Sequence, residues 1–241
     1  MNATFILIVF FALLSAYLAS AKSVAVLAID MQPVFYPGGA LSVPGANATN
    51  IQYFLVILHK MGYPIVASKD SHPTNHVSFK QWPRHAVKGE QLDNNRFFVG
   101  DALFPVVEEL AEHIQPKGEN PDYDSYSAFF DDGGHDTGLS TYLSSKGYKT
   151  LIVLGEAGNY CVKASIIDAL NEGFNVLLIT DMTNYIPSTP ETEEQTLRDI
   201  NKYAFNRFKT TTSQKFLQNP ASFVDFTDYM SLYFDQLRHF L

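Results

Sequence analysis

Short β-branched runs alternate along this chain with longer amphipathic stretches, an order typical of βαβ units around a largely parallel sheet. The sequence therefore predicts an α/β fold of three layers, with one central, mainly parallel sheet between two layers of helices. The expected strands, of which the one near His113 has the weakest pattern, are Val24–Ile29, Pro64–Ala67, His113–Gln115, Thr150–Leu154 and Val176–Thr180.

The stretches between the strands predict helices whose ends carry local signals. Gly62, Gly147 and Gly173 stand where a left-handed residue commonly follows a helix, and Thr189-Pro190 fits an N-cap followed by proline. A last helix is expected from Ser213 to Leu241, and its aromatic residues either pack on the domain or form a contact in a homo-oligomer. The other expected helices are Ile51–Met61, Asp101–Glu112, Gly138–Lys146, Tyr160–Glu172 and Pro190–Phe208.

Residues 1–21 have the pattern of a signal peptide. An apolar run from Phe5 to Leu18 precedes Ala19-Ser20-Ala21, a small-residue pattern that predicts cleavage after Ala21. The run is shorter than the roughly 20 residues that span a bilayer, which favours secretion over an uncleaved membrane anchor. We expect residues 22–241 to form a single extracellular domain without stable membrane association.

Charge and cysteine content narrow the classes of partner and of chemistry. A net charge of −8 without clusters of lysine and arginine argues against nucleic acid as a partner. The single cysteine, Cys161, excludes an intramolecular disulfide. Because exported proteins normally use cysteines in disulfide pairs, an unpaired thiol in such a chain indicates a role other than cross-linking. Asn47-Ala48-Thr49 is a glycosylation acceptor pattern, which predicts a glycan on Asn47.

Chemically active side chains follow several of the expected strands. Ligands of parallel sheets bind beyond the carboxyl ends of the strands, so Asp30, Asp70 and Cys161 are expected to share a site. At the start of a helix, the thiol of Cys161 would have a lowered pKa and backbone N–H groups beside it to stabilise an oxyanion. Asp30 could relay protons. The alternatives are a buried structural cysteine and an aspartate that caps a turn.

A carboxylate and several imidazoles stand close together after the second strand. Asp70, His72, His76 and His85 lie within sixteen residues. One carboxylate with two or more imidazoles suits a divalent transition metal, and Zn, Fe and Mn are all compatible with this set. The alternative is a group of surface histidines without a metal.

The order of these residues resembles the isochorismatase-like cysteine hydrolases and, among them, the nicotinamidases. The resemblance runs from about residue 23 to about residue 181, most of the chain after the signal peptide. The segments that carry it are Asp30-Met31-Gln32, Pro37-Gly38-Gly39-Ala40-Leu41-Ser42-Val43-Pro44-Gly45, Lys69-Asp70-Ser71-His72-Pro73-Thr74-Asn75-His76-Val77-Ser78-Phe79, Trp82-Pro83-Arg84-His85, Lys117-Gly118, Asp124-Ser125-Tyr126-Ser127-Ala128-Phe129 and Tyr160-Cys161-Val162-Lys163-Ala164.

The resemblance implies a role for each matched residue. Asp30, Lys117 and Cys161 would form the catalytic triad, and Asp70, His72 and His85 would bind one divalent metal ion, with zinc as the first expectation. His76 would be a further ligand or would only line the site. Phe35, Trp82 and Tyr126 would surround the substrate ring, and the N–H groups of Ala157, exposed by a cis peptide in the family, and of Cys161 would stabilise the oxyanion.

The implied reaction is the hydrolysis of nicotinamide to nicotinate and ammonia through a thioester on the cysteine. Two departures from the family pattern bear on it: Pro33-Val34 replaces Asn-Asp, and Glu156-Ala157-Gly158-Asn159 replaces Leu-Ala-Thr-Asp. Glu156 would oppose ionisation of the thiol unless it points away, and Gly158 would loosen the turn. The alternatives are a secreted amidase for another small aromatic amide and a non-enzymatic binding module on the same fold.

Overall fold

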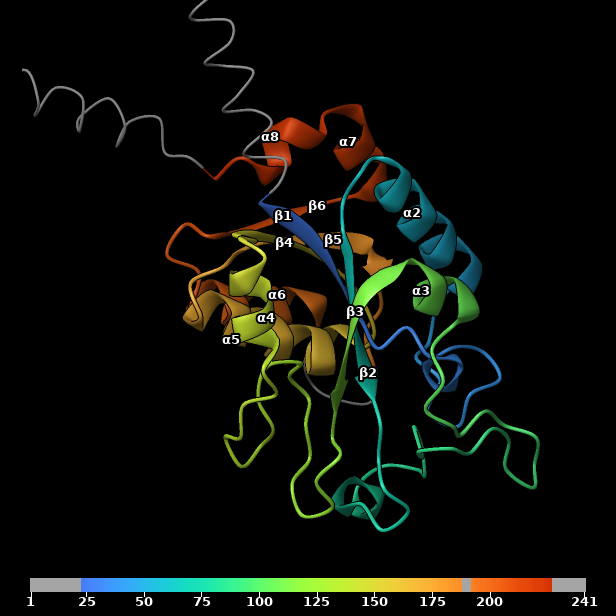
Figure 1. Ribbon diagram of the computed structural model, residues 1–241. Coiled ribbons are helices and arrows are strands. Elements are labelled where there is room, and N and C mark those ends of the chain that lie inside the picture. The colour runs from blue at the N-terminus through green and yellow to red at the C-terminus, as the bar shows by residue number, and fades with distance from the viewer. Residues whose placement is uncertain (1–22, 188–191, 227–241) are drawn as a thin grey trace, which may run out of the picture.

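Six strands form one sheet in the computed structural model, which describes residues 23–187 and 192–226 (Figure 1). Their order across the sheet is β3-β2-β1-β4-β5-β6, and every neighbouring pair is parallel. The strands are β1 Val24–Ile29, β2 Ile65–Asp70, β3 Ala111–Lys117, β4 Thr150–Gly155, β5 Asn175–Thr183 and β6 Phe208–Thr211. The predicted three-layer α/β fold with a central parallel sheet is confirmed.

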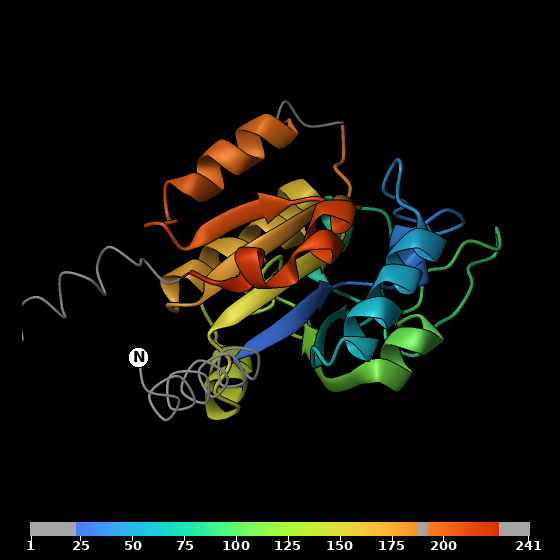
Figure 2. The same ribbon diagram turned by 90° about the horizontal axis from the view of Figure 1, so that it is seen from above.

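Helices cover both faces of the sheet (Figures 1 and 2). Successive side chains of a strand point to opposite faces, so Val24, Val26 and Ala28 of β1 join one core cluster while the residues between them join the other. The first face is covered by α2 Ala48–Lys60, α3 Pro105–Leu110, α7 Ser213–Gln218 and α8 Pro220–Val224, and the second by α4 Leu139–Ser145, α5 Lys163–Asn171 and α6 Glu193–Asn201.

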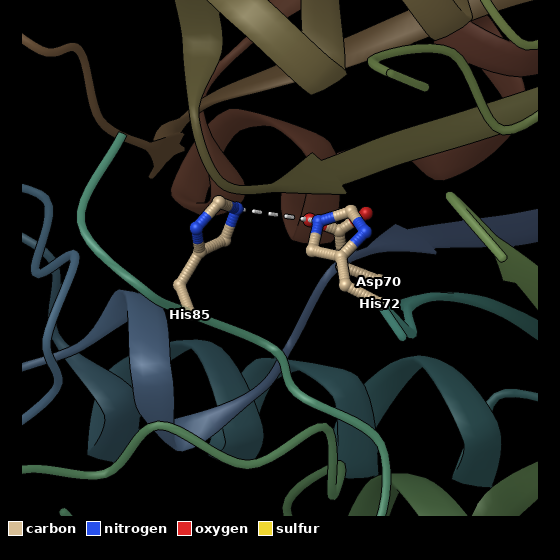
Figure 3. A group of neighbouring side chains, drawn as sticks. All are labelled: Asp70, His72 and His85. Carbon is tan, nitrogen blue, oxygen red and sulfur yellow. Dashed lines mark ion pairs between the residues drawn. The ribbon is translucent and has the colours of Figure 1, made fainter. Parts of the chain in front are cut away.

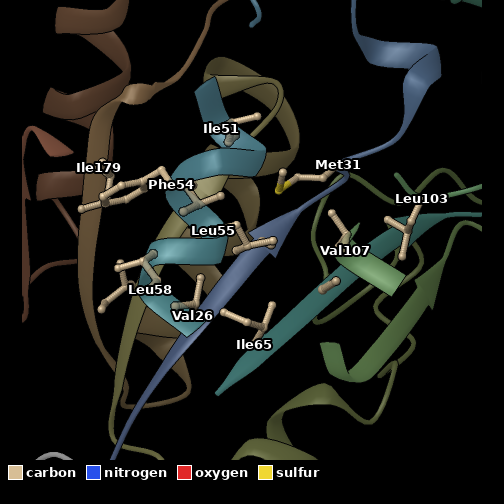
Figure 4. Close-up of a cluster of buried hydrophobic side chains, with 14 of the residues drawn as sticks. Val26, Met31, Ile51, Phe54, Leu55, Leu58, Ile65, Leu103, Val107 and Ile179 are labelled. Atoms are coloured by element: carbon tan, nitrogen blue, oxygen red, sulfur yellow. The ribbon is translucent and has the colours of Figure 1, made fainter. Parts of the chain in front are cut away.

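Helix α2 shows how the sequence pattern builds this core (Figure 4). Its side chains Ile51, Phe54, Leu55 and Leu58 recur at helical spacing and are buried against the sheet. Asn47 caps the helix by accepting a hydrogen bond from the backbone N–H of Asn50 at 3.0 Å. Gly62, Gly147 and Gly173 all have positive φ after helices, as predicted.

The predicted helix Pro190–Phe208 is wrong at both ends. Helix α6 begins at Glu193 with Thr192 as its N-cap, and the predicted cap at Thr189-Pro190 lies outside the described residues. The helix stops at Asn201 because the chain turns through positive φ at Phe205 and Asn206 and then forms a strand that the sequence did not predict, β6, paired with β5.

Two other predicted helices are shorter or divided. The stretch Asp101–Glu112 contains only α3, because the chain becomes extended at Ala111 and continues directly into β3. The predicted C-terminal helix is divided into α7 and α8, since Asn219 leaves the helical region before Pro220, which starts the second helix. Its part beyond residue 226 and the predicted signal peptide lie outside the described residues. Among the described helices, none has the length and apolar character that a bilayer span requires.

The order of the strands fixes where a ligand can bind. The chain runs from β1 outward to β2 and β3 and then returns to β4 on the other side of β1. The carboxyl ends of β1 and β4, where Ile29 pairs with Gly155, therefore lie at a topological switch point, the usual ligand site of an open parallel sheet.

Candidate active site

A buried lysine joins the ends of three strands at the switch point. Lys117 and Asp70 are partners in the β2–β3 register, and the Lys117 Nζ atom lies 2.7 Å from Asp70 Oδ1. The same Nζ atom lies 3.0 Å from Asp30 Oδ2 and 3.6 Å from Cys161 Sγ. The structure thus brings together the aspartate, lysine and cysteine that the sequence singled out, although they are far apart along the chain.

Neighbouring polar groups hold this cluster in place. Asp30 has a φ of 47°, and its N–H donates to Ser68 Oγ at 3.1 Å while Ser68 Oγ donates to Asp30 Oδ1 at 2.5 Å. Lys117 also donates to the carbonyl oxygen of Ser125 at 2.7 Å. Gln32 fixes the end of β2, accepting from the Asp70 N–H and donating to the Asp70 carbonyl, both at 2.8 Å. Sequence reasoning assigned no role to Gln32, Ser68 or Ser125. Ser68 directly follows the predicted strand Pro64–Ala67, and the structure extends that strand through it to Asp70.

The protonation of the thiol differs from the sequence-based expectation. Cys161 lies in the π-helical turn η3, Gly158–Val162, which leads into α5. Burial raises the pKa of the Cys161 thiol well above its ordinary value, and the attraction of Lys117 only partly offsets this. The predicted lowering of this pKa at a helix start is therefore wrong for the resting state. For Lys117, burial acts to lower the pKa, but Asp30 and Asp70 hold it well above its ordinary value.

Asp70, His72 and His85 converge beside this cluster (Figure 3). Asp70 Oδ2 lies 3.1 Å from His72 Nε2 and 3.6 Å from His85 Nε2. Each Nδ1 atom faces a backbone carbonyl, Gly118 O at 2.9 Å for His72 and Pro83 O at 2.7 Å for His85, so both Nε2 atoms are directed toward the carboxylate. The buried His72 Nε2 makes no well-aligned hydrogen bond with the described residues, despite its short distance to Asp70. An orphaned imidazole nitrogen facing a carboxylate fits a metal site.

Gly118 and His76 shape the surroundings of this set. Gly118 has a φ of +65°, and a Cβ atom there would lie 2.4 Å from the His72 ring. The ring of His76 stacks on His72 with centroids 4.0 Å apart. His76 Nδ1 lies 2.7 Å from Ser78 Oγ and Nε2 lies 3.0 Å from the Tyr123 carbonyl oxygen. Because both ring nitrogens have protein partners, this geometry favours a site-lining His76, although His72, His76 and Asp124 also lie close enough to share an ion.

An aromatic cavity opens onto the thiol of Cys161 and onto Asp70 and His85. The four residues expected around the substrate, Phe35, Trp82, Tyr126 and Ala157, all line it together with Cys161. Trp82 Nε1 donates to the Tyr126 hydroxyl at 2.9 Å, which fixes both rings. The lining residues to which sequence reasoning gave no role are Leu41, Val43, Asp124, Ser125, Tyr160 and Ile186. Of these, Ile186 lies beyond the segments that carried the resemblance.

The Glu156 side chain does not face the thiol. The Glu156–Ala157 peptide bond is cis, and the Glu156 carboxylate accepts hydrogen bonds from the backbone N–H of Asn184 at 3.0 Å and from Asn184 Nδ2 at 2.8 Å. Burial raises the pKa of Glu156 to about 8, although these hydrogen bonds favour the ionised form.

This raised pKa predicts a pH-dependent stability. The folded-state pKa of Glu156 lies above the ordinary value of 4.5, so the folded protein binds the additional proton between these values and loses stability as pH rises toward about 8. In Glu156→Gln this contribution disappears, so the variant should gain stability relative to the wild type as pH rises. Urea unfolding of both proteins at about pH 5, 7 and 9 measures the difference. A pH-independent difference between the two proteins would contradict the assignment.

Comparisons with known proteins show which family this chain belongs to. The sequence profile described as the isochorismatase domain matches residues 24–215. The nicotinamidase of Escherichia coli K12 is 36% identical over 180 residues, covering 65% of this chain and 81% of the relative, and that of Acinetobacter baylyi is 33% identical over 195 residues, covering 70% and 85%.

Solved structures show the same similarity. PnC1 from L. infantum in complex with nicotinate is 28% identical with a TM-score of 0.69, covering 80% of this chain and 94% of that one. The pyrazinamidase of Pyrococcus horikoshii in complex with zinc is 34% identical with a TM-score of 0.62, covering 79% and 99%.

Proposed function

Because this chain belongs to the isochorismatase domain family, we propose that it is a nicotinamidase, which hydrolyses nicotinamide to nicotinate and ammonia. One observation carries the proposal: the thiol of Cys161 lies 3.6 Å from a buried ammonium that also pairs with Asp30, at a cavity lined by aromatic rings. A flat, uncharged aromatic amide matches such a cavity, and the nicotinamidases among the relatives support the choice of substrate.

The proposed reaction uses the buried cluster to move one proton. Asp30 accepts the proton of the Cys161 thiol while Lys117 stabilises the thiolate, whose sulfur attacks the carboxamide carbon. The N–H groups of Ala157 and Cys161 stabilise the oxyanion. Asp30 protonates the departing ammonia, and the thioester remains on the sulfur. Asp30 then takes a proton from water as it attacks the thioester, and returns it to the sulfur as nicotinate leaves.

Asp70, His72 and His85 are the residues that would hold a divalent metal ion. A carboxylate oxygen and two Nε2 atoms suit zinc, iron or manganese, and we propose zinc first because the similar P. horikoshii pyrazinamidase was solved with that ion. When bound, the metal supplies a Lewis-acidic site for the pyridine nitrogen of the substrate.

Removing the metal is expected to lower nicotinamide turnover by about tenfold or more, since the substrate ring then loses one of the groups that orient it. Ammonia release is measured before and after dialysis against a chelator, with metal analysis of the same samples. Readdition of zinc should restore turnover. Full activity in a sample shown to lack metal would contradict a role for the ion.

The experiment that tests the function is an ammonia-release assay with purified residues 22–241 on nicotinamide, pyrazinamide and benzamide. We expect kcat/KM to be highest for nicotinamide. A higher kcat/KM for another amide would show that the protein is an amidase of different specificity. If no amide is hydrolysed and Cys161 is unreactive, the result would favour the non-enzymatic binding module.

We also propose that the protein is secreted and glycosylated. Asn47 is exposed at the start of α2, where an oligosaccharide has room. In eukaryotic expression the secreted chain should begin at Lys22, and peptide N-glycosidase should lower its mass. The variant Thr49→Ala, which removes the acceptor pattern, should show no such shift. Protein retained inside the cells with Met1 intact would contradict the proposal.

A further inference from the structure

The departures from the family pattern around Glu156 all meet one segment, Asn184–Ile186, which follows β5. Glu156 accepts two hydrogen bonds from Asn184, and the N–H of Gly158 donates to the Asn184 carbonyl oxygen at 2.7 Å. Asn159 Nδ2 donates to the Ile186 carbonyl oxygen and its Oδ1 accepts from the Ile186 N–H, both at 3.1 Å. The turn that precedes the nucleophile and this segment are therefore held together as one unit.

Gly158 belongs to the same arrangement. A Cβ atom at this position would lie 2.6 Å from the ring of Tyr185, so the ring occupies the space that a side chain at residue 158 would need. The glycine therefore permits close packing against Tyr185. The sequence alone predicts that Gly158 loosens the turn, whereas in the structure the residue is packed tightly.

The Glu156 carboxylate accepts hydrogen bonds from Asn184 that leucine, the residue of the family pattern at this position, cannot accept. Two donors of Asn184, its backbone N–H and its Nδ2, converge on the two oxygens of the carboxylate. Leucine would leave both donors without this acceptor, and an unsatisfied donor in a buried site destabilises the arrangement around it. Glu156 and Asn184 thus act as a pair.

Ile186 connects this hydrogen-bonded unit to the active-site cavity. It lines the active-site cavity together with Ala157, Tyr160 and Cys161, and it packs against the core cluster that contains Phe35 and Val43. Its backbone is held on both sides, N–H and carbonyl, by Asn159. The position of this cavity wall is thereby set by residues outside the catalytic cluster.

We propose that Ile186 determines substrate size and that Glu156, Asn159 and Asn184 are positioning residues that hold it. The cavity then selects single-ring heteroaromatic carboxamides over bicyclic ones. The choice of amides rests on the proposed function, whereas the restriction of cavity width by Ile186 does not.

The first test enlarges the cavity. In Ile186→Ala, the ratio of kcat/KM for quinoline-3-carboxamide to that for nicotinamide should rise by about tenfold or more, as expected when side-chain volume is removed from an apolar pocket. Ile186→Val should shift the ratio less, in the same direction, and serves if the alanine variant does not fold. The matched control is Leu217→Ala, at an exposed position on α7, which should leave the ratio unchanged. An unchanged ratio in folded Ile186 variants would overturn the proposal.

The second test separates positioning from simple stabilisation. Glu156→Leu and Asn184→Ala should each shift the same ratio, and the double variant should shift it no further than either alone, because the two residues act through one pair. Glu156→Gln keeps one acceptor and should restore part of the wild-type ratio. A lower Tm with an unchanged ratio in all these variants would show a structural role only.

A third experiment tests the restriction of cavity width by Ile186 without depending on amide hydrolysis. Alkylation of Cys161 by iodoacetamide and by the bulkier N-phenyl iodoacetamide reports access to the thiol without amide turnover. In Ile186→Ala the rate with the bulky reagent should rise relative to the small one. If the wild type fails to hydrolyse nicotinamide while this shift occurs, the proposed function is wrong and the size restriction stands. If it hydrolyses nicotinamide and neither ratio moves, the size restriction is wrong and the function stands.

Discussion

Cys161→Ala is expected to lower kcat for nicotinamide by at least roughly 10⁴-fold, because the proposed reaction passes through a covalent bond to the sulfur. Residual turnover would come from binding and from the oxyanion donors alone. Ammonia release under saturating nicotinamide measures the loss, and mass spectrometry of a rapidly quenched wild-type reaction should detect the acyl adduct on Cys161.

Cys161→Ser is the matched control for this variant, since it keeps the size of the side chain but not the nucleophilicity of the thiol. It should be nearly as inactive as the alanine variant while unfolding at the same urea concentration as the wild type. Ammonia release within tenfold of the wild type in either variant would exclude this cysteine as the nucleophile.

Lys117→Ala is expected to reduce both stability and activity. The ammonium is buried and pairs with Asp30 and Asp70, and its removal leaves the buried Asp30 carboxylate without its cation. Breaking a buried ion pair in this way typically lowers the free energy of unfolding by about 3–5 kcal/mol. Turnover should fall by roughly 10²-fold or more, since the ammonium that stabilises the thiolate is lost. Urea unfolding and ammonia release measure the two effects.

Lys88→Ala provides the control for the lysine variant. Lys88 pairs with Glu119 at 2.9 Å, but both side chains are largely exposed, so the loss of this pair should change the free energy of unfolding far less than the loss of Lys117. Equal destabilisation by the two lysine variants would contradict the buried ion-pair network as the source of the effect.

The regular parts of the fold could be predicted where burial is continuous. Strand β1 was predicted with its observed bounds because every residue of Val24–Ile29 is buried and apolar. Strand β6 was missed because Phe208–Thr211 has only one fully buried residue and owes its extended form to pairing with β5. A local pattern cannot show a strand that is defined by its neighbour.

The sequence predicts those site residues that closely follow a recognisable strand. Asp30, Asp70 and Cys161 were singled out because they follow strands, whereas Lys117 came from the family resemblance alone. The thiol pKa was misjudged because reasoning from a helix terminus omits burial and the two carboxylates nearby. The positions of Glu156 and Ile186 depend on contacts with residues about 27 or 28 places away along the chain, which a single sequence does not reveal.

The register that joins Asp70 to Lys117 also bears on how the protein acquires activity. The reactive groups come from the ends of β1, β2 and β3 and from the turn after β4, so no short segment of the chain contains them together. Closing such long loops is slow compared with forming local contacts. We therefore expect catalytic competence to appear late in refolding, after most of the helical signal has formed. Recovered turnover should then report only molecules in which strands β1 to β4 have assembled in the correct order.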